Sequence, residues 1–461
     1  MKNRLRLPRL LAAALIGAVL PALLGAPATA AAPPPPNTSK SAGQQWELLS
    51  LATGKYVSVE ASSGDELHAR AGTPGITEQF TLHTDNVAKG ATVALRSQAN
   101  GAYVAAEFGA GADGRYGKLR ARTEGPPAGW EKLELVPQPQ AGADVYALRY
   151  HDGTRERYVT ADAGATGDGL LQARATAVAS WELFRLLAVP APADPPPPPA
   201  ASPRAIKALT WNVCADNNKN CGFYHTAAGP LAEEITARAK AAGNPDVILL
   251  EEFCEKLAKP VELALETELG GGWDVRFAPV QYEVPGTKVK ARKNCQPDAS
   301  GADRGAYGVA LAVPEENTWY RAVELPSPPG VEQRTALCAT VASWAAQVCA
   351  AHFSTGGPGY DDPERVFQPQ QAQALRQAAS LPGYRPLLGG DLNAAPSTGV
   401  PATLYSAYEE CDAHSATPNR PTAGSSKIDY LFGGGTWSGC GVATDTGSSD
   451  HRAVWGTLTL S

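Results

Sequence analysis

The feature that most constrains the fold is a short element that recurs three times at a constant spacing of 52 residues. It reads Leu-His-Ala-Arg at 67–70, Leu-Arg-Ala-Arg at 119–122 and Leu-Gln-Ala-Arg at 171–174. Around each copy, apolar and polar residues alternate between turns rich in Gly and Asp, which is typical of short β-strands. Because one such unit cannot bury its apolar face alone, three units predict a closed β structure over residues 45–189.

Each copy of the element is flanked by matching residues, with a Tyr-Val pair upstream and Phe80, Leu133 or Phe184 downstream. This pattern resembles a β-trefoil of the fascin-like type across nearly all of residues 45–189, which implies an all-β trefoil. Because related secreted proteins use such a module to tether or target a catalytic partner, we expect it to bind a surface ligand or a polysaccharide.

Residues 1–32 are typical of a cleaved export signal. Four basic residues precede an apolar stretch at 10–24, and the small residues Ala28-Thr-Ala30 follow as a cleavage site. About fifteen apolar residues are too few for a membrane span. We therefore expect a secreted, monomeric protein without a transmembrane anchor. Pro-rich spacers are predicted at 33–44 and 190–204, the second stiffened by five consecutive prolines at 195–199.

All eight cysteines lie after residue 203. An even number in an exported chain predicts four disulfides, although some cysteines being buried free thiols stays open. Local geometry predicts two pairs, Cys338 with Cys349 across a hairpin and Cys214 with Cys221 in a small loop. No C-x2-C pair occurs, which argues against a structural zinc site.

Residues 205–461 alternate strand-like and helix-like segments. Strands are predicted at 206–213, 246–253, 305–313 and on both sides of a turn near Ser343, with helices at 231–242 and 368–379. Polar residues follow the strands, at the edge where an α/β sheet places its site. The predicted constellation is Asn212, Glu252, His352, Asp391, Asn393, Asp429, Asp450 and His451.

The segment Gly389-Gly-Asp-Leu-Asn393 is the centre of this constellation. Residues two apart in a strand share a face, so Asp391 and Asn393 can point at one substrate atom, and the two glycines allow close approach to a ligand. The set contains carboxylates for one or two divalent ions but no apt Ser or Cys nucleophile beside a base. Mg²⁺ with such ligands activates water against a phosphoester.

Six motifs in order carry a second resemblance: W-N-V at 211–213, L-L-E-E at 249–252, A-H-F-S at 351–354, G-G-D-L-N at 389–393, K-I-D-Y at 427–430 and S-D-H at 449–451. Together they resemble the endonuclease/exonuclease/phosphatase, or DNase I-like, superfamily. The resemblance implies an α/β four-layer sandwich of two mixed β-sheets flanked by helices. The superfamily includes nucleases, sphingomyelinases and inositol polyphosphate phosphatases.

The resemblance also implies roles. Glu252 is the main ligand of Mg²⁺ or Mn²⁺, with Asn212 and Asp450 nearby. The sequence departs from the family at Glu251, where many members carry Gln, and we place the metal on the second residue of the pair. The remaining five act on the substrate: Asp391 orients or deprotonates the attacking water, Asn393 helps to hold the phosphate, His451 contacts the phosphate and is oriented by Asp429, and His352 is the second histidine on the phosphate side.

Charge bears on the substrate. From residue 201 onward, 21 Lys and Arg face 28 Asp and Glu, a net charge of −7, which argues against broad electrostatic capture of nucleic acid. The loop at 280–303 holds the one local basic run, which either meets a nucleic-acid backbone or is merely solvated. We expect Arg304 to be exposed, Trp211 and Trp273 to be buried, and removal of residues 33–200 to spare turnover.

These observations predict a secreted, divalent-metal-dependent phosphodiesterase that acts on a phosphoester, with nucleic acid as the first choice. Two alternatives stay open. One is a sphingomyelinase-like or small-molecule, inositol phosphate phosphoesterase. The other is a non-catalytic adhesive or binding protein.

Overall fold

The computed structural model describes residues 43–85, 92–109, 116–164, 168–190, 195, 198, 204–314 and 318–460. All of them belong to one compact unit, Pro35–Ser461. The predicted export signal, and nearly all of both predicted Pro-rich spacers, lie outside the described residues. No helix in these ranges combines the length and the apolar character needed to cross a membrane.

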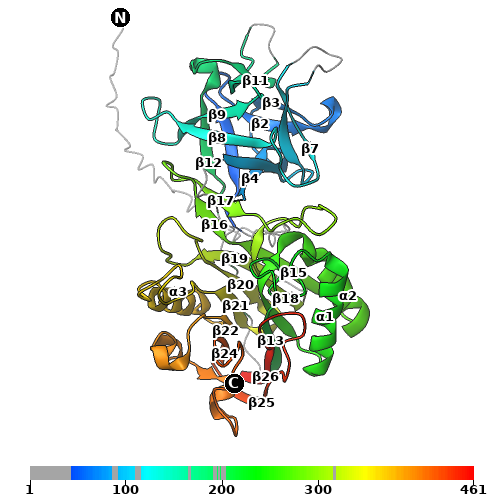
Figure 1. The fold of residues 1–461 in the computed structure, drawn as a ribbon, viewed down its shortest axis with the longest axis vertical. Coiled ribbons are helices and arrows are strands. Elements are labelled where there is room, and N and C mark those ends of the chain that lie inside the picture. Colours follow the sequence, from blue (N-terminus) through cyan, green and yellow to red (C-terminus); the bar gives the residue numbers. More distant parts are fainter. Residues whose placement is uncertain are drawn as a thin grey trace, which may run out of the picture. The chain divides into compact units, whose positions relative to one another are not determined.

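The N-terminal region is a closed antiparallel barrel (Figure 1). Its strands are β1 (Trp46–Ser50), β2 (Lys55–Glu60), β3 (Glu66–Ala71), β4 (Gln79–Thr84), β5 (Thr92–Ser97), β6 (Tyr103–Glu107), β7 (Lys118–Thr123), β8 (Lys132–Pro137), β9 (Val145–His151), β10 (Glu156–Ala161), β11 (Leu171–Ala175) and β12 (Phe184–Ala188). Closure follows because β1 pairs with β2, β4 and β12, while β9 pairs with β8, β10 and β12.

The repeated element forms the three adjacent strands β3, β7 and β11. Their leucines, Leu67, Leu119 and Leu171, are fully buried in one hydrophobic core. The arginines that end the first two copies point outward into ion pairs, Arg70 with Glu60 and Arg122 with Glu107. The repeat therefore fixes which residues enter the barrel core.

The predicted fold class, an all-β trefoil followed by a helix-flanked four-layer sandwich, was wrong. In the N-terminal region the strands join into one closed antiparallel barrel, and the sheet continues beyond it into β17 (Lys290–Lys293) and β16 (Gln281–Glu283). The 52-residue period predicts similar strands, but a period alone does not determine how those strands pair. Pairing depends on contacts distant in sequence, such as β17 with β4.

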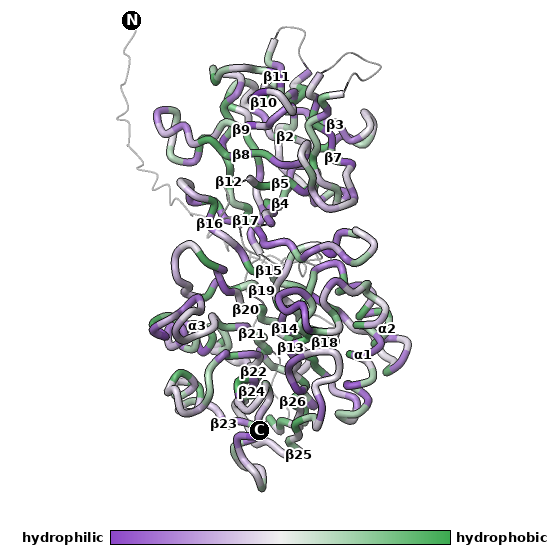
Figure 2. The backbone as a smooth tube through the Cα atoms, in the orientation of Figure 1, coloured by the Kyte–Doolittle hydropathy of each residue, from purple (hydrophilic) through white to green (hydrophobic). Residues whose placement is uncertain are grey.

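The remaining strands form two mixed sheets of six. The first holds β15 (Trp273–Pro279), β18 (Tyr307–Pro314), β14 (Val247–Cys254), β13 (Arg204–Asn212), β26 (Val454–Leu460) and β25 (Thr436–Val442), in that order. The second holds β19 (Thr318–Glu324), β20 (Thr335–Val341), β21 (Ala346–His352), β22 (Arg385–Asp391), β24 (Asp429–Gly433) and β23 (Glu409–Glu410). Buried residues of both sheets, including Leu249 and Val348, share one core. Figure 2 shows that the strongly hydrophobic stretches follow the strands.

Helices are few in this region. Among the described residues the α-helices are α1 (Ala228–Ala241), α2 (Ala258–Leu269), α3 (Gln368–Ala379) and the single turn α4 (Ala402–Tyr405). Leu231 of α1 and Val261 of α2 share a core with the first sheet, and Leu375 of α3 shares one with the second. The long connections at 353–367 and 411–428 form turns and a short 3-10 segment rather than α-helices, so two mixed sheets with few helices replace the predicted flanked sandwich.

Four disulfides tie the two-sheet region together: Cys214–Cys221, Cys254–Cys295, Cys338–Cys349 and Cys411–Cys440. Both pairs predicted from local geometry are present, and no free cysteine remains. Cys338 and Cys349 are direct cross-strand partners on β20 and β21, as a hairpin pairing requires. Trp211 and Trp273 are core residues, as predicted.

Candidate active site

The ends of strands from both sheets bring the predicted site residues together. In the second sheet, register places His352 beside Asp391 and Asp391 beside Asp429. In the first sheet, Asn212 ends β13 next to Glu251 of β14. The Asn212 side chain donates to Asp391 Oδ2 at 3.0 Å, which links the two sheets at the site.

Asp391 is the buried centre of this arrangement. Its Oδ1 accepts the backbone N–H of Asn393 at 2.8 Å, while its Oδ2 faces the amide of Asn212 and, at 3.5 Å, Nε2 of His352. Burial and the neighbouring carboxylate of Asp429 raise the pKa of Asp391 to about 7, against the opposing charge of His451. A carboxyl group with this pKa can gain or lose a proton near neutral pH.

The two glycines before Asp391 serve packing of the protein itself rather than approach to a ligand. A Cβ at Gly389 would lie 2.1 Å from the Tyr430 carbonyl oxygen. A Cβ at Gly390 would lie 2.0 Å from the Ala351 oxygen and 2.9 Å from Glu251, and its φ of +122° disfavours other residues. The glycines let β22 pass close to its neighbours, and this corrects the ligand-approach interpretation.

His451 forms a charged pair with Asp429. Its Nδ1 lies 2.9 and 3.1 Å from the two Asp429 oxygens, and its Nε2 faces Asp391 Oδ2 at 3.8 Å. Burial opposes charge on the imidazole, but Asp429 and Asp391 outweigh it and hold the pKa of His451 well above its usual value. His451 is therefore a cation at neutral pH, with its Nδ1–H fixed on Asp429.

Glu252 sits at a bulge in β14 and has a left-handed backbone, with a φ of +53°. Its Oε1 accepts from Asn212 at 3.3 Å, while its Oε2 is shielded from solvent and has no hydrogen-bond partner among the described residues. A buried carboxylate oxygen without a partner costs free energy, so this atom is a candidate metal ligand. Burial raises the pKa of Glu252.

The neighbouring Glu251 points elsewhere. It is fully buried and accepts both hydrogen-bond contacts of Thr210 at 3.3 Å. Burial, Asp429 and Asp391 raise its pKa well above the usual value. Glu251 is therefore the packed member of the pair, and the carboxylate oxygen without a partner among the described residues belongs to Glu252.

His352 is buried next to a second cation, Arg334. Arg334 donates from Nη1 to His352 Nδ1 at 3.4 Å, and the Asn393 amide lies 3.0 Å from Nε2. Burial and the charge of Arg334 lower the pKa of His352 well below its usual value. The site thus contains one charged and one neutral histidine.

Asp450 is exposed at the rim of the site, unlike the buried carboxylates. Its Oδ2 accepts from Asn218 at 3.0 Å and its Oδ1 lies 3.9 Å from His451 Nε2. Its charge also contributes to the raised pKa of Glu252, which places the two carboxylates near each other. All eight predicted residues therefore gather around one site.

Sequence reasoning missed two cations of this site, Arg334 and Lys293. Glu332 holds both: its Oε1 accepts from Lys293 at 2.7 Å, and its Oε2 lies 3.4 Å from Arg334. Arg334 stands at the start of a predicted strand and Lys293 lies in the basic run at 280–303, and these were the available signals. Arg304, predicted to be exposed, is buried, because its guanidinium donates to Asp216 and to the Ala215 carbonyl.

The basic run at 280–303 was also misread as a loop. It lies largely on the hairpin β16–β17, where Arg292 is buried and Lys290 and Lys293 pair with Glu324 and Glu332. Of the four basic residues of this run, Lys288 is exposed, Lys290 and Lys293 are half-buried, and Arg292 is buried.

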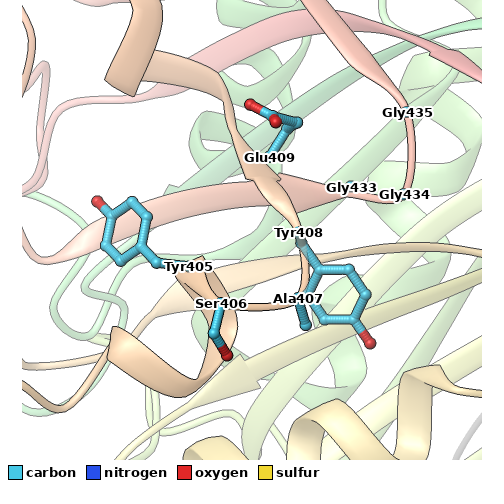
Figure 3. Close-up of a pocket in the computed structure, with 8 residues that line it drawn as sticks. All are labelled: Tyr405, Ser406, Ala407, Tyr408, Glu409, Gly433, Gly434 and Gly435. Atoms are coloured by element: carbon cyan, nitrogen blue, oxygen red, sulfur yellow. The ribbon is translucent and has the colours of Figure 1, made fainter.

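A separate cavity of about 280 Å³ lies away from these residues (Figure 3). Residues 405–409 and 433–435 line it. None of the predicted site residues contributes to its wall, so it is not part of the candidate site.

Comparison with known proteins gives one family match and several similar solved structures. The profile of the Endonuclease/Exonuclease/phosphatase family matches residues 209–451. The human nocturnin catalytic domain with bound sulfate is 17% identical, covering 56% of this chain and 95% of that chain, with a TM-score of 0.38. Sphingomyelinase C from Streptomyces griseocarneus is 17% identical, covering 55% and 99%, with a TM-score of 0.34.

In the N-terminal region, the designed threefold-symmetric protein ThreeFoil is 14% identical, covering 31% of this chain and 97% of that chain, with a TM-score of 0.26. No curated protein matches the chain. The family match spans more than half of the chain and contains every predicted site residue. The chain belongs to the endonuclease/exonuclease/phosphatase family and is a hydrolytic phosphoesterase.

Proposed function

We propose that this protein is an exported, divalent-metal-dependent phosphodiesterase, with nucleic acid as its first substrate class. The observation that carries the proposal is that two features occur together where strand ends of the two sheets meet. Asp391 and the charged His451 face each other at 3.8 Å, and the Glu252 oxygen beside them is buried with no hydrogen-bond partner in the part of the chain that the structure describes. The four disulfides favour an oxidising compartment.

The residues present fit a hard divalent cation. Glu252 offers a carboxylate oxygen without a hydrogen-bond partner among the described residues, and the Asn212 oxygen, which accepts the Cys214 N–H, and the Asp450 carboxylate lie nearby as further oxygen ligands. Oxygen ligands with one or two carboxylates suit Mg²⁺ or Mn²⁺. When bound, such an ion polarises a phosphoryl oxygen and neutralises the charge that grows on it.

The side chains of the chain perform the remaining steps. Asp391, with a pKa near neutrality, accepts the proton of the attacking water. His451, charged and held by Asp429, binds a phosphate oxygen and hands a proton to the leaving oxygen. Neutral His352 and the Asn393 amide hold a second phosphate oxygen from the opposite side.

A second candidate, a small or lipid phosphoester, is favoured by the ion pairing of the basic hairpin. Since Arg292 is buried and Lys290 and Lys293 face carboxylates, this hairpin, all of whose residues are described, offers a nucleic-acid backbone only Lys288 as an exposed cation. The net charge of −7 after residue 200 agrees with this candidate. The ordered site motifs keep nucleic acid first.

Hydrolysis by the purified protein separates these candidates. The panel contains plasmid DNA, RNA, sphingomyelin and inositol phosphates, each with Mg²⁺ or Mn²⁺ and with EDTA. Metal-dependent cleavage of DNA or RNA is expected. Cleavage of lipid or small esters alone would identify the protein as the second candidate, a lipid or small-molecule phosphoesterase acting through the same site. Absence of all hydrolysis with either metal contradicts the proposal.

A further inference from the structure

We propose that the N-terminal barrel positions the active-site edge, with Arg96 as a positioning residue that acts through Glu255. The identity of that edge as the metal and phosphate site rests on the proposed function. Hydrolysis then depends on the barrel, which does not serve only to attach the catalytic region to another surface. Three sets of contacts carry this inference.

The first is a shared sheet and core. The hairpin β16–β17 leaves the two-sheet region, and β17 pairs in parallel with β4 of the barrel, Arg292 opposite His83 and Lys293 opposite Thr84. Its apolar residues Val284, Val289 and Ala291 belong to the barrel core. The barrel core is therefore completed by residues that lie more than ninety positions further along the chain than its last strand.

The second is a buried ion network centred on Glu255. Arg96, from β5 of the barrel, donates to Glu255 Oε2 at 2.8 Å, and Arg292 donates to Oε1 at 3.4 Å. Burial opposes the charge, but the two guanidinium groups outweigh it and lower the pKa of Glu255 to about 2. Breaking such a buried pair leaves an uncompensated charge, so it is strongly held.

Glu255 transmits this constraint to the site. It stands three residues after Glu252 at the end of β14, next to the Cys254–Cys295 disulfide. Its backbone N–H donates to the Ala306 carbonyl at 2.8 Å, and its carboxylate accepts the Ala306 N–H at 3.3 Å. The left-handed turn that aims Glu252 at the metal position is thereby anchored at its C-terminal side.

The third is a line of charges from the hairpin to His352. Lys293, the residue after Arg292, donates to Glu332 at 2.7 Å and lies 3.9 Å above the Tyr307 ring. Glu332 also pairs with Arg334, whose Nη1 reaches His352. Displacing β17 from the barrel would therefore disturb both the metal side and the phosphate side of the site.

Beyond these three, Asn294, which follows β17, accepts from His83 Nδ1 through its Oδ1 at 2.8 Å and donates from Nδ2 to Asp85 at 3.2 Å. The prediction that removal of residues 33–200 spares turnover is therefore replaced. Such a deletion exposes the three apolar hairpin residues and leaves Glu255 without Arg96.

The test uses the full chain and the variant Arg96→Ala, with Arg96→Lys as the conservative variant. Arg149→Ala is the matched control, because Arg149 pairs with Glu134 and Glu156 within the barrel. Hydrogen exchange is measured for peptides covering 253–257 and 305–307, and Mn²⁺ affinity is measured by calorimetry. Arg96→Ala should accelerate exchange in both peptides and weaken Mn²⁺ binding about tenfold. Arg96→Lys should restore much of the slow exchange and of the Mn²⁺ affinity. Arg149→Ala should change neither the exchange rate nor the Mn²⁺ affinity.

Unchanged exchange and unchanged Mn²⁺ affinity in a folded Arg96→Ala protein overturn the inference. If Arg96→Ala does not fold, Glu255→Gln, which keeps the shape and removes the charge, is measured in its place against the same two outcomes. A wild-type protein that binds no Mn²⁺ refutes the proposed function instead, since the exchange measurement does not depend on metal.

Discussion

His451 is joined to Asp429 by an Nδ1 contact of 2.9 Å, in a position where neither side chain is open to solvent. The pairing fixes which nitrogen carries the inward proton, and leaves Nε2 facing Asp391. It also explains why a buried histidine remains charged. The acid–histidine pair is therefore the electrostatic core of the site.

Replacing Asp429 with Asn should lower the pKa of His451, because the carboxylate that stabilises the imidazolium is removed. Hydrolysis should fall by at least about 100-fold, the usual range for loss of acid–base assistance. Histidine ring nitrogen shifts followed by NMR across a pH titration measure the pKa directly. An unchanged pKa in the variant would show that Asp429 does not control His451.

Glu252→Gln should weaken Mn²⁺ binding by at least about tenfold, because the unpartnered carboxylate oxygen is lost. Glu251→Gln is the matched control. Glu251 is buried with a raised pKa and bonded to Thr210, so its neutral isostere should leave Mn²⁺ affinity nearly unchanged. Titration calorimetry measures the Mn²⁺ affinity of both variants. Weakened binding in Glu251→Gln with unchanged binding in Glu252→Gln would identify Glu251 as the metal ligand.

Gly390→Ala should destabilise the protein by at least about 2 kcal/mol, since the added Cβ meets the Ala351 oxygen at 2.0 Å on a left-handed backbone. Urea unfolding measures the loss. Gly125→Ala is the control, because nothing lies within 4 Å of a Cβ there and its φ is not left-handed. Equal stability of both variants would contradict the packing role of Gly390.

The free energy of unfolding should decrease as the pH falls from 6.5 towards 3. Burial lowers the pKa of His83 from 6.5 to about 3, so in this range the unfolded chain binds a proton that the folded chain does not. The contribution of His83 to the free energy of unfolding is fully present above pH 6.5 and is lost on acidification. In His83→Gln the free energy of unfolding should change less with pH, which urea unfolding at a series of pH values measures. An identical pH dependence in the variant would exclude His83 as its source.

Much of the two-sheet region could be predicted from sequence because its signals are local. The predicted helix at 368–379 is α3, and the predicted strand at 246–253 is β14 within one residue. Polar residues at strand ends, such as Asp391 and His352, were found because apolar runs stop directly before them.

What sequence reasoning missed depends on contacts between distant segments. A basic run at 288–293 looks the same whether it is solvated or, as here, buried against β4 and Glu255. Arg334 carries no motif, and its role follows only from its contact with His352. The closed barrel was missed for the same reason, because a repeat predicts units but not their pairing.

The most direct test of the central claim is the hydrolysis rate of bis-p-nitrophenyl phosphate by the wild-type protein and by Asp391→Asn, with Mn²⁺ and with EDTA. Wild-type turnover should vanish with EDTA and return with Mn²⁺, and Asp391→Asn should be slower by about 100-fold or more in Mn²⁺. Turnover that persists in EDTA, or full turnover by Asp391→Asn, would contradict metal-dependent hydrolysis at this site.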